Sequence, residues 1–437
     1  MKRREFLKKT GTIALGAGLS TLSHKVLGAN ERINLGVIGT GRIAWENMNV
    51  FLENNDVQIG AVCDVYQPHL QKGIELTGGK AKGYGDFRRI LEDKDIDAVM
   101  VSSPDHWHAL QTIMACEAGK DVYVEKPISH NIYEGRVMVE AARKYNRIVQ
   151  VGTQQRSGIH YQEAVKFIQS GKLGEIGLVR CFNFSNEYPG GIGNPQETEP
   201  PSDLDWDMWL GPAPKVPYNR NRWHFPGGWA TFRYFWDYAG GMLTDWGVHH
   251  IDIIQWAMKA DSPVAVNVQG GKYYMKDNRD TPDTLEAVFE YPMFICIYSN
   301  TVLNKFGIDN AGYRIQFYGT KGTMLVTRSG WEVIPEEKSS KDKKKIKLME
   351  PVEMKAENQR KPHIRNFIDC IKSRNLPICD IETGHYSTVT PLLGKISYLV
   401  NERIKWDAKN EIITNSKKGN QLLSREYRSP WKLPDYH

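Results

Sequence analysis

Side chains suited to proton transfer stand at two distant points of this 437-residue sequence. Glu125-Lys126-Pro127 follows a short apolar run at 122–124, and a lysine buried at a strand end can hydrogen-bond a reacting hydroxyl. Asp245 and His249 are four positions apart, so on one helix the carboxylate would orient the imidazole for proton exchange with an alcohol. We predict that Lys126, Asp245 and His249 bind substrate and act on it. An exposed lysine, a capping aspartate and a core histidine are the alternative interpretations.

A glycine-rich turn predicts a dinucleotide site. The string Gly39-Thr40-Gly41-Arg42-Ile43-Ala44 follows the buried run 33–38 and opens a helical segment. Glycines let a pyrophosphate approach backbone N–H groups at the positive end of a helix. Asp64 ends the next apolar run, where a carboxylate accepts hydrogen bonds from ribose hydroxyls and repels a 2′-phosphate. This pattern favours NAD over NADP; a glycine turn with a capping aspartate is the alternative.

A third motif, Ser102-Ser103-Pro104-Asp105-His106-Trp107-His108, follows the buried run that ends near residue 101. In open parallel sheets, ligands bind at the carboxyl ends of the strands. We therefore predict that Ser103, His106, Glu125 and Lys126 contact the cofactor together with the glycine turn. His106 and His108 could instead cap or pack the helix that begins here.

The irregular stretch 188–238 is rich in proline, glycine and tryptophan. Loops of this length inside compact domains are usually functional. We predict that Arg222, Trp223 and His224 bind substrate, because an aromatic face stacks on a pyranose and polar groups bond its hydroxyls. A structural belt at a domain or subunit interface explains the same tryptophans.

The spacing of apolar residues predicts an α/β protein with two domains after a leader at 1–29. Residues 30–152 alternate short β-branched runs with helical segments, which indicates a Rossmann-type, doubly wound parallel sheet. Residues 153–437 carry period-two strands separated by turn residues, which is typical of an antiparallel sheet. Two later helices, at 363–373 and 383–402, could pack back on the first domain.

In this order, the motifs resemble those of the Gfo/Idh/MocA family of oxidoreductases. The matching strings are G-x-G-x-x-A at 39–44, E-K-P at 125–127, and D-x-x-x-H within Gly240–Asp252. The resemblance implies a Rossmann domain followed by an α/β domain whose large open, mainly antiparallel sheet often mediates oligomers, here a dimer or tetramer. It also implies NAD(P)-dependent hydride transfer to or from sugars, glycosides or cyclitols, with Lys126, Asp245 and His249 as the catalytic trio.

Residues 1–29 predict export. Arg3-Arg4 followed by Phe6-Leu7-Lys8, and then a small-residue apolar stretch, resembles a twin-arginine signal and predicts a periplasmic protein. The apolar stretch is too short and too polar for a stable membrane span. Without the leader the formal net charge is only +1, so nucleic acid is not an expected partner.

Export also bears on how the cofactor is used, because free NAD is scarce outside the cytoplasm. A tightly retained NAD permits two activities: a dehydrogenase, which we favour, and a redox-neutral glycosidase that oxidises, eliminates and re-reduces. A third hypothesis is a sugar-binding module with a metal held by His224, Asp245, His249 and His250. No spacing among these residues demands a metal, so we predict none.

The cysteines and one lysine-rich run complete the sequence pattern. Six cysteines without a C-x-x-C pair predict buried free thiols, although a bridge between Cys370 and Cys379 remains open. Six lysines within 338–347 indicate a solvated hairpin tip or loop, with an anionic docking patch as the alternative.

Overall fold

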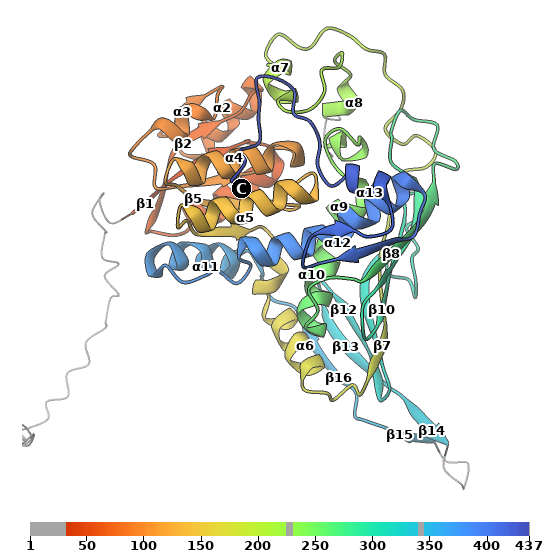
Figure 1. Cartoon of the computed structure of the whole chain (residues 1–437). Helices are drawn as coiled ribbons and strands as arrows, with labels where there is room; N and C mark the ends of the chain where they lie inside the picture. The colour runs from red at the N-terminus through yellow and green to blue at the C-terminus, as the bar shows by residue number, and fades with distance from the viewer. Residues whose placement is uncertain (1–31, 224–229, 340–344, 437) are drawn as a thin grey trace, which may run out of the picture.

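The computed structural model describes residues 32–223, 230–339 and 345–436, which form two domains side by side (Figure 1). The first contains a parallel sheet of strand order β3-β2-β1-β4-β5-β6. Its strands are β1 (Ile33–Ile38), β2 (Val57–Cys63), β3 (Lys82–Tyr84), β4 (Ala98–Val101), β5 (Asp121–Val124) and β6 (Val149–Val151). The order reverses direction between β1 and β4, as in a Rossmann fold, which confirms the predicted doubly wound sheet.

Helices cover both faces of this sheet. On one face lie α1 (Arg42–Leu52) and α2 (Gln67–Leu76); on the other lie α3 (Arg88–Glu92), α4 (Asp105–Glu117) and α5 (Ile132–Lys144). Because both faces are covered, β4 and β5 are apolar at almost every position and buried throughout. Polar side chains of this domain therefore meet a ligand at the strand ends and not on the sheet faces.

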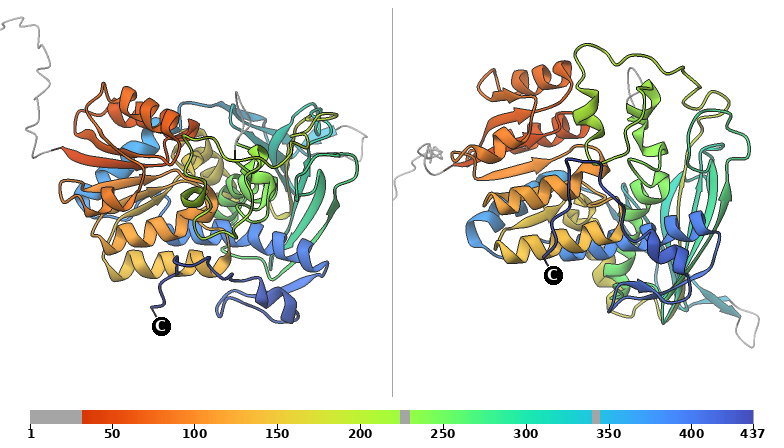
Figure 2. Two further views of the ribbon diagram at one scale, coloured as in Figure 1. Left: turned by 90° about the horizontal axis from the view of Figure 1, so that it is seen from above. Right: turned by 45° about the horizontal axis from the view of Figure 1, so that its top comes forward.

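The second domain is built on a ten-stranded sheet of order β16-β13-β12-β11-β7-β10-β9-β8-β17-β18. Its strands are β7 (Ile176–Phe184), β8 (Ala265–Gly271), β9 (Thr284–Glu290), β10 (Ile295–Thr301), β11 (Tyr313–Gly319), β12 (Gly322–Thr327), β13 (Gly330–Pro335), β16 (Val352–Lys355), β17 (Ile404–Asp407) and β18 (Ile412–Ile413). One face packs on α6 (Ile159–Gln169), α10 (Gly247–Met258) and α12 (Ile381–Val400) in a shared apolar core. Figure 2 shows these helices on one side of the sheet only.

The sheet is mainly antiparallel, as predicted, with one exception. Strands β7 and β10 run parallel, with Cys181 opposite Tyr298. These two strands are more than a hundred residues apart in the chain. β7 follows α6, whereas β10 returns from its antiparallel neighbour β9 through a short turn, and apolar alternation within each strand carries no information on how β7 and β10 run relative to each other.

Two late helices join the domains. α11 (Arg360–Ser373) packs Ile364 and Phe367 into the core beneath the first sheet, beside α1. α12 contacts α5 of the first domain as well as α10 and β8 of the second. One continuous 20-residue helix thus spans the boundary and fixes the distance between the two sheets.

Beyond α13 (Lys417–Gln421), residues 422–436 return over the first domain, and Figure 1 shows this dark blue segment passing α7 before it ends near α5. Arg425 donates to the carbonyl oxygens of Asp237 (2.9 Å) and His106 (3.3 Å). Arg428 donates to Gly211 O at 2.9 Å. The ring of Trp431 lies 4.8 Å from that of Trp107. The segment therefore ties the aromatic stretch to α4.

The cysteines, the lysine-rich run and the helices also bear on predictions made from the sequence. All six cysteines are free and buried, so Cys370 and Cys379 are not bridged. The two described ends of the lysine-rich run lie in the exposed strands β14 (Glu337–Ser339) and β15 (Lys345–Lys347), which pair antiparallel (Figure 1). Residues 340–344 lie outside the described residues. No helix within the described residues is long and apolar enough to cross a membrane. The predicted export signal lies outside the described residues.

Candidate active site

A cavity of about 710 Å³ lies between the domains, at the carboxyl ends of β1, β2, β4 and β5. Most of the site residues predicted from sequence line it: Gly39, Gly41, Arg42, Ile43, Asp64, Ser103, Glu125, Lys126, Trp223, Asp245 and His249. Thr40, His106 and Arg222 do not line it, and His224 lies outside the described residues.

The glycine turn forms one end of the cavity. Gly39 has a φ of +83°, and a Cβ there would lie 2.7 Å from the backbone nitrogen of Ser103, so no other residue fits. Gly41 is the N-cap of α1, has open space around it, and brings no capping side chain. The N–H groups of the first turn of α1 are therefore available to a dinucleotide phosphate. These residues fit the NAD cofactor predicted from sequence.

Asp64 is held in place at the end of β2. Its Oδ2 accepts from the Thr40 backbone nitrogen at 2.8 Å, and its Oδ1 accepts from the Tyr66 nitrogen at 2.9 Å. The sequence had predicted that Thr40 contacts the cofactor. In the structure Thr40 is fully buried, and its backbone N–H positions Asp64. The fixed carboxylate still lines the cavity, where a ribose would need an acceptor.

After β4, the cavity is lined by Ser103 and His108, and the prediction for His106 is wrong. The His106 ring is buried on the other side of α4, where its Nε2 lies 3.0 Å from Trp209 O. The ring nitrogens of His108 each lie 2.7 Å from a carbonyl oxygen, that of Pro127 and that of Ser103. His108 thus links the loop after β4 to the loop that carries Lys126.

Three charged side chains meet at the inner end of the cavity. Lys126 Nζ lies 2.7 Å from Asp245 Oδ1, and Arg233 Nε lies 3.0 Å from the same oxygen. Burial alone would raise the pKa of Asp245, but Arg233 and Lys126 together hold it well below its usual value. Asp245 is therefore an ionised carboxylate that fixes the Lys126 ammonium.

The predicted contact between Asp245 and His249 is absent from the described part of the chain. α9 (Gly241–Asp245) ends at the aspartate and α10 begins at Gly247, so Trp246 separates the two residues onto different helices. The Asp245 carboxylate pairs with Lys126 and Arg233, and among the described residues no hydrogen bond or ion pair joins it to His249. Its negative charge still acts on the imidazole, because it raises the pKa of His249 against the larger lowering effects. The Asp245 carboxylate is therefore an ion-pair partner of Lys126 and not a hydrogen-bond partner of the His249 imidazole.

His249 lines the cavity while only 4% exposed. Burial, followed by the positive charges of Lys126 and Arg328, lowers the pKa of its imidazole well below the usual value. Its Nδ1 has no hydrogen-bond partner among the described residues. The imidazole is therefore neutral at pH 7 and able to accept a proton.

Asp105 is a fourth charged group at this end, and sequence reasoning treated it only as a helix start. It is 5% exposed and lines the cavity as the first residue of α4. Burial raises its pKa to about 7; the positive charge of Arg233 lowers this pKa and the negative charge of Asp245 raises it. Asp105 thus titrates in the physiological range next to an ionised carboxylate.

The aromatic stretch contributes to the site differently from the prediction. Trp223 lines the cavity, with its ring 4.6 Å from that of Tyr66. Arg222 instead pairs with Asp237 at 3.4 Å and stacks over Phe235, which directs it away from the cavity. The four-residue helix α8 (Arg220–Trp223) places neighbouring side chains on different sides, which explains the difference.

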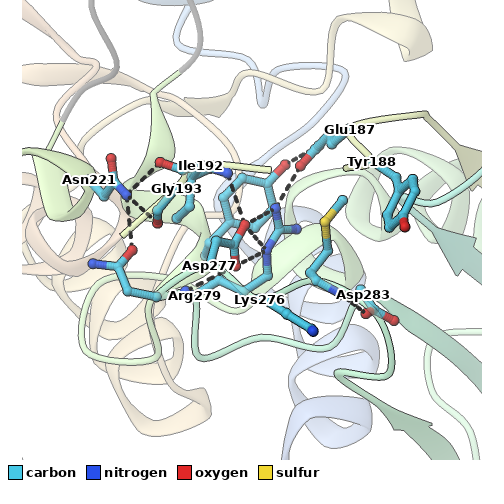
Figure 3. A network of polar contacts seen from close by, with 12 residues as sticks. Glu187, Tyr188, Ile192, Gly193, Asn221, Lys276, Asp277, Arg279 and Asp283 are labelled. Atoms are coloured by element: carbon cyan, nitrogen blue, oxygen red, sulfur yellow. Dashed lines mark hydrogen bonds and ion pairs between the residues drawn. The ribbon is translucent and has the colours of Figure 1, made fainter. Parts of the chain in front are cut away.

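A buried polar network secures the same stretch (Figure 3). Arg279 lies 2.7 Å from Asp277 and 2.8 Å from Glu187, and the Tyr234 hydroxyl donates to Glu187 at 2.5 Å. The Arg279 guanidinium also stacks 4.3 Å over the Tyr234 ring. Because Tyr234 is adjacent to Arg233, this network fixes the backbone from which Arg233 reaches Asp245.

Sequence reasoning missed the basic side chains of the cavity: Arg233, Arg328 and Arg360. Arg233 stands between Phe232 and Tyr234 in the aromatic stretch, and a charge inside a buried aromatic run was the available signal. Arg328 and Arg360 come from the second domain's hairpin and from α11, and no local motif marks either. No cluster of three potential metal ligands occurs among the described residues, and His224, one of the four residues of the metal hypothesis, lies outside them.

The comparisons with known proteins agree with this geometry. Residues 33–153 match the model described as "Oxidoreductase family, NAD-binding Rossmann fold" of Gfo/Idh/MocA proteins. Residues 139–286 and 343–433 match "Oxidoreductase family, C-terminal alpha/beta domain" of the same group. The chain therefore belongs to the Gfo/Idh/MocA oxidoreductase family and carries its NAD-binding Rossmann domain.

Curated relatives include inositol 2-dehydrogenase of Salmonella typhimurium, 28% identical over 157 residues, which covers 35% of this chain and 47% of the relative. The chain thus matches about half the length of that enzyme. An uncharacterized oxidoreductase of Bacillus subtilis, YrbE, is 22% identical over 308 residues, which covers 68% of this chain and 75% of YrbE.

Solved structures share the fold. The WlbA dehydrogenase from Bordetella pertussis, in complex with NADH and UDP-GlcNAcA, has a TM-score of 0.63 at 20% identity, covering 86% of this chain and 99% of that one. Levoglucosan dehydrogenase, in complex with NADH and levoglucosan, has a TM-score of 0.64 at 17% identity, with the same coverage.

Proposed function

We propose that this protein is an NAD-dependent dehydrogenase that oxidises a carbinol of a sugar, glycoside or cyclitol, or reduces the corresponding ketone. The observation that carries the proposal is that one cavity contains both the uncapped start of α1 and the buried group of Lys126, Asp245, Arg233 and His249. The first suits a dinucleotide and the second suits proton exchange with an alcohol.

In oxidation, neutral His249 takes the proton from the substrate hydroxyl. Lys126 donates a hydrogen bond to the same oxygen as it gains alkoxide character. Asp245 holds the Lys126 ammonium in position through the 2.7 Å ion pair. When bound, the nicotinamide supplies the hydride acceptor for the carbinol carbon.

Asp64 favours NAD over NADP. Both of its oxygens accept from backbone N–H groups, so the negative charge stays fixed where a 2′-phosphate would have to bind. The segment 422–436 braces Trp107, which lines the cavity, and this supports tight retention of the cofactor.

We also propose that the protein is exported to the periplasm and forms a homodimer or homotetramer. The twin-arginine string at Arg3-Arg4 supports export. The helix-free face of the ten-stranded sheet supports self-association, because it exposes apolar side chains such as Ile295 at 43%. Light scattering of the purified protein measures the oligomer, and cell fractionation measures the location.

The testing experiment separates dehydrogenase from glycosidase. Purified protein is denatured to quantify released NAD(H), and native protein is incubated with a panel of glycosides while nicotinamide absorbance and products are followed. A keto-sugar formed in step with NADH supports the dehydrogenase, and His249→Asn should abolish it. Released aglycone with no net NADH supports the redox-neutral glycosidase instead. No turnover of any glycoside by cofactor-loaded protein contradicts both.

A further inference from the structure

Arg328 enters the cavity from the second domain, opposite the Rossmann strands. It follows β12 directly, in the tight turn before β13. Ser329 N donates to Thr327 Oγ1 at 3.1 Å, and Ala356 N donates to Ser329 O at 2.9 Å. The backbone on both sides of the turn is therefore fixed, and Arg328 is presented to the cavity from a rigid support.

The groups that hold the Arg328 guanidinium are uncharged. Its centre lies 4.7 Å over the Trp246 ring and 5.5 Å over the Tyr313 ring. Trp246 is also the residue that separates α9 from α10, so the guanidinium is stacked beside the start of the helix that carries His249. These contacts orient the cation without neutralising it.

Arg328 differs in this respect from the other basic side chains deep in the cavity. Lys126 and Arg233 both pair with Asp245, and Arg360 pairs with Glu46 at 2.7 Å. Within the described residues, no carboxylate oxygen lies within 4.0 Å of Arg328. A half-buried guanidinium without a carboxylate partner has lost part of its hydration, so binding an anion is favourable.

The charges that line the cavity are nearly balanced, and this singles out Arg328. Five basic side chains line it, Arg42, Lys126, Arg233, Arg328 and Arg360, with five acidic ones, Glu46, Asp64, Asp105, Glu125 and Asp245. Among the described residues, each basic side chain of this set except Arg328 pairs with a carboxylate. Arg328 is therefore the cation of the cavity that is available to an anionic ligand.

We propose that the substrate is an acidic sugar, and that Arg328 binds its oxyanion while His249 and Lys126 act on a hydroxyl of the same ring. A uronate carboxylate is the best fit, because the planar guanidinium fork matches a carboxylate in two parallel hydrogen bonds. A sulfate ester offers the same oxyanion chemistry. This inference rests on the proposed oxidation at the same site and narrows its substrate class.

The test uses matched pairs of methyl glycosides on cofactor-loaded protein: glucuronide against glucoside, galacturonide against galactoside, and a glucoside 6-sulfate as a third acid. Binding is measured by calorimetry, and oxidation by the keto product. We expect at least one acid to be bound and oxidised in preference to its neutral partner. Arg328→Gln should lower kcat/KM for that acid by about 10- to 150-fold, the usual range for a lost charge-assisted bond. The neutral partner should change little.

Two further variants make the result interpretable. Arg328→Lys keeps the charge and loses the fork, so its loss on the acid should be smaller than that of Arg328→Gln. Arg403→Gln removes an exposed arginine that pairs with Glu290 on the far strand β9, and should leave both substrates unchanged. Retained cofactor content in each variant shows that the cavity is intact.

The possible negative results distinguish a wrong substrate class from a wrong enzyme activity. If neutral sugars are oxidised as well as acids, or if Arg328→Gln lowers both equally, the acidic substrate class is wrong and the dehydrogenase stands. If the acids bind through Arg328 without being oxidised, the anion site stands and the dehydrogenase is wrong. A preference for the sulfate over the uronate assigns the oxyanion as sulfate.

Discussion

Replacing Asp245 by asparagine tests the charge arrangement of the site most directly. The substitution keeps the shape of the side chain and removes the charge that Lys126 and Arg233 share at 2.7 and 3.0 Å. Breaking a buried ion pair costs about 3–5 kcal/mol, and because Lys126 and Arg233 retain some exposure, 14% and 22%, we expect about 3 kcal/mol at pH 7.5.

The effect must depend on pH with a definite sign. The folded pKa of Asp245 is held below its unfolded value of about 3.9, so its stabilisation is fully present above pH 5 and is lost as pH falls toward the folded pKa. The difference between wild type and Asp245→Asn should therefore shrink in acid. Adding Arg233→Met to Asp245→Asn should cost less than the sum of the two single changes, because one of the cations that lost its carboxylate is removed.

Urea unfolding followed by tryptophan fluorescence provides the measurement, since the chain contains 12 tryptophans. Unfolding curves at pH 7.5 and at pH 3, below the unfolded pKa of about 3.9, are recorded for wild type, both single variants and the double variant. The reasoning is refuted if Asp245→Asn costs less than about 1 kcal/mol at pH 7.5, or if the double variant is additive.

Three further predictions concern other parts of the cavity. Burial raises the pKa of Asp105 in the folded protein to about 7, above its unfolded value of about 3.9, so the free energy of unfolding falls as pH rises from 4 to 7. Asp105→Asn should therefore increase the free energy of unfolding at pH 8 by about 2–4 kcal/mol and have little effect at pH 4, measured by urea unfolding. Asp64→Ser should lower the NAD/NADP ratio of kcat/KM by about tenfold or more, and an unchanged ratio contradicts the assigned role. Trp431→Ala removes the ring 4.8 Å from Trp107 and should weaken NAD binding by about 2- to 10-fold by calorimetry, whereas Tyr436→Phe, which loses only a surface hydrogen bond, should not.

Local sequence was sufficient to predict the Rossmann domain and to select Lys126 and His249 as side chains that line the cavity. The glycine turn depends on backbone freedom at Gly39, and the position of Lys126 depends on β5 ending one residue before Glu125. Both are short-range properties, so spacing alone predicted them. The family match confirms the resemblance and the class of oxidoreductase.

The partners of those groups depend on contacts across the chain, and sequence spacing failed there. Asp245 and His249 have helical spacing, but the carboxylate pairs with Lys126, 119 residues away in the chain, and that partner cannot be predicted from local spacing. The motif alone does not show which of His106 and His108 faces the cavity, because this depends on how α4 packs against the aromatic stretch. Arg328 has no local signal because its neighbours, Trp246 and Tyr313, come from two other elements.

The contacts of residues 422–436 have a consequence for biogenesis. Ribosomes release a chain from its first residue onward, so the Rossmann strands and the glycine turn emerge long before Arg425, Arg428 and Trp431 do. The contacts that these three residues make with His106, Gly211 and the cavity-lining Trp107 therefore form only after both domains have been synthesised. We expect ribosome-bound chains that stop before residue 422 to exchange NAD freely, with stable cofactor loading as a post-translational step.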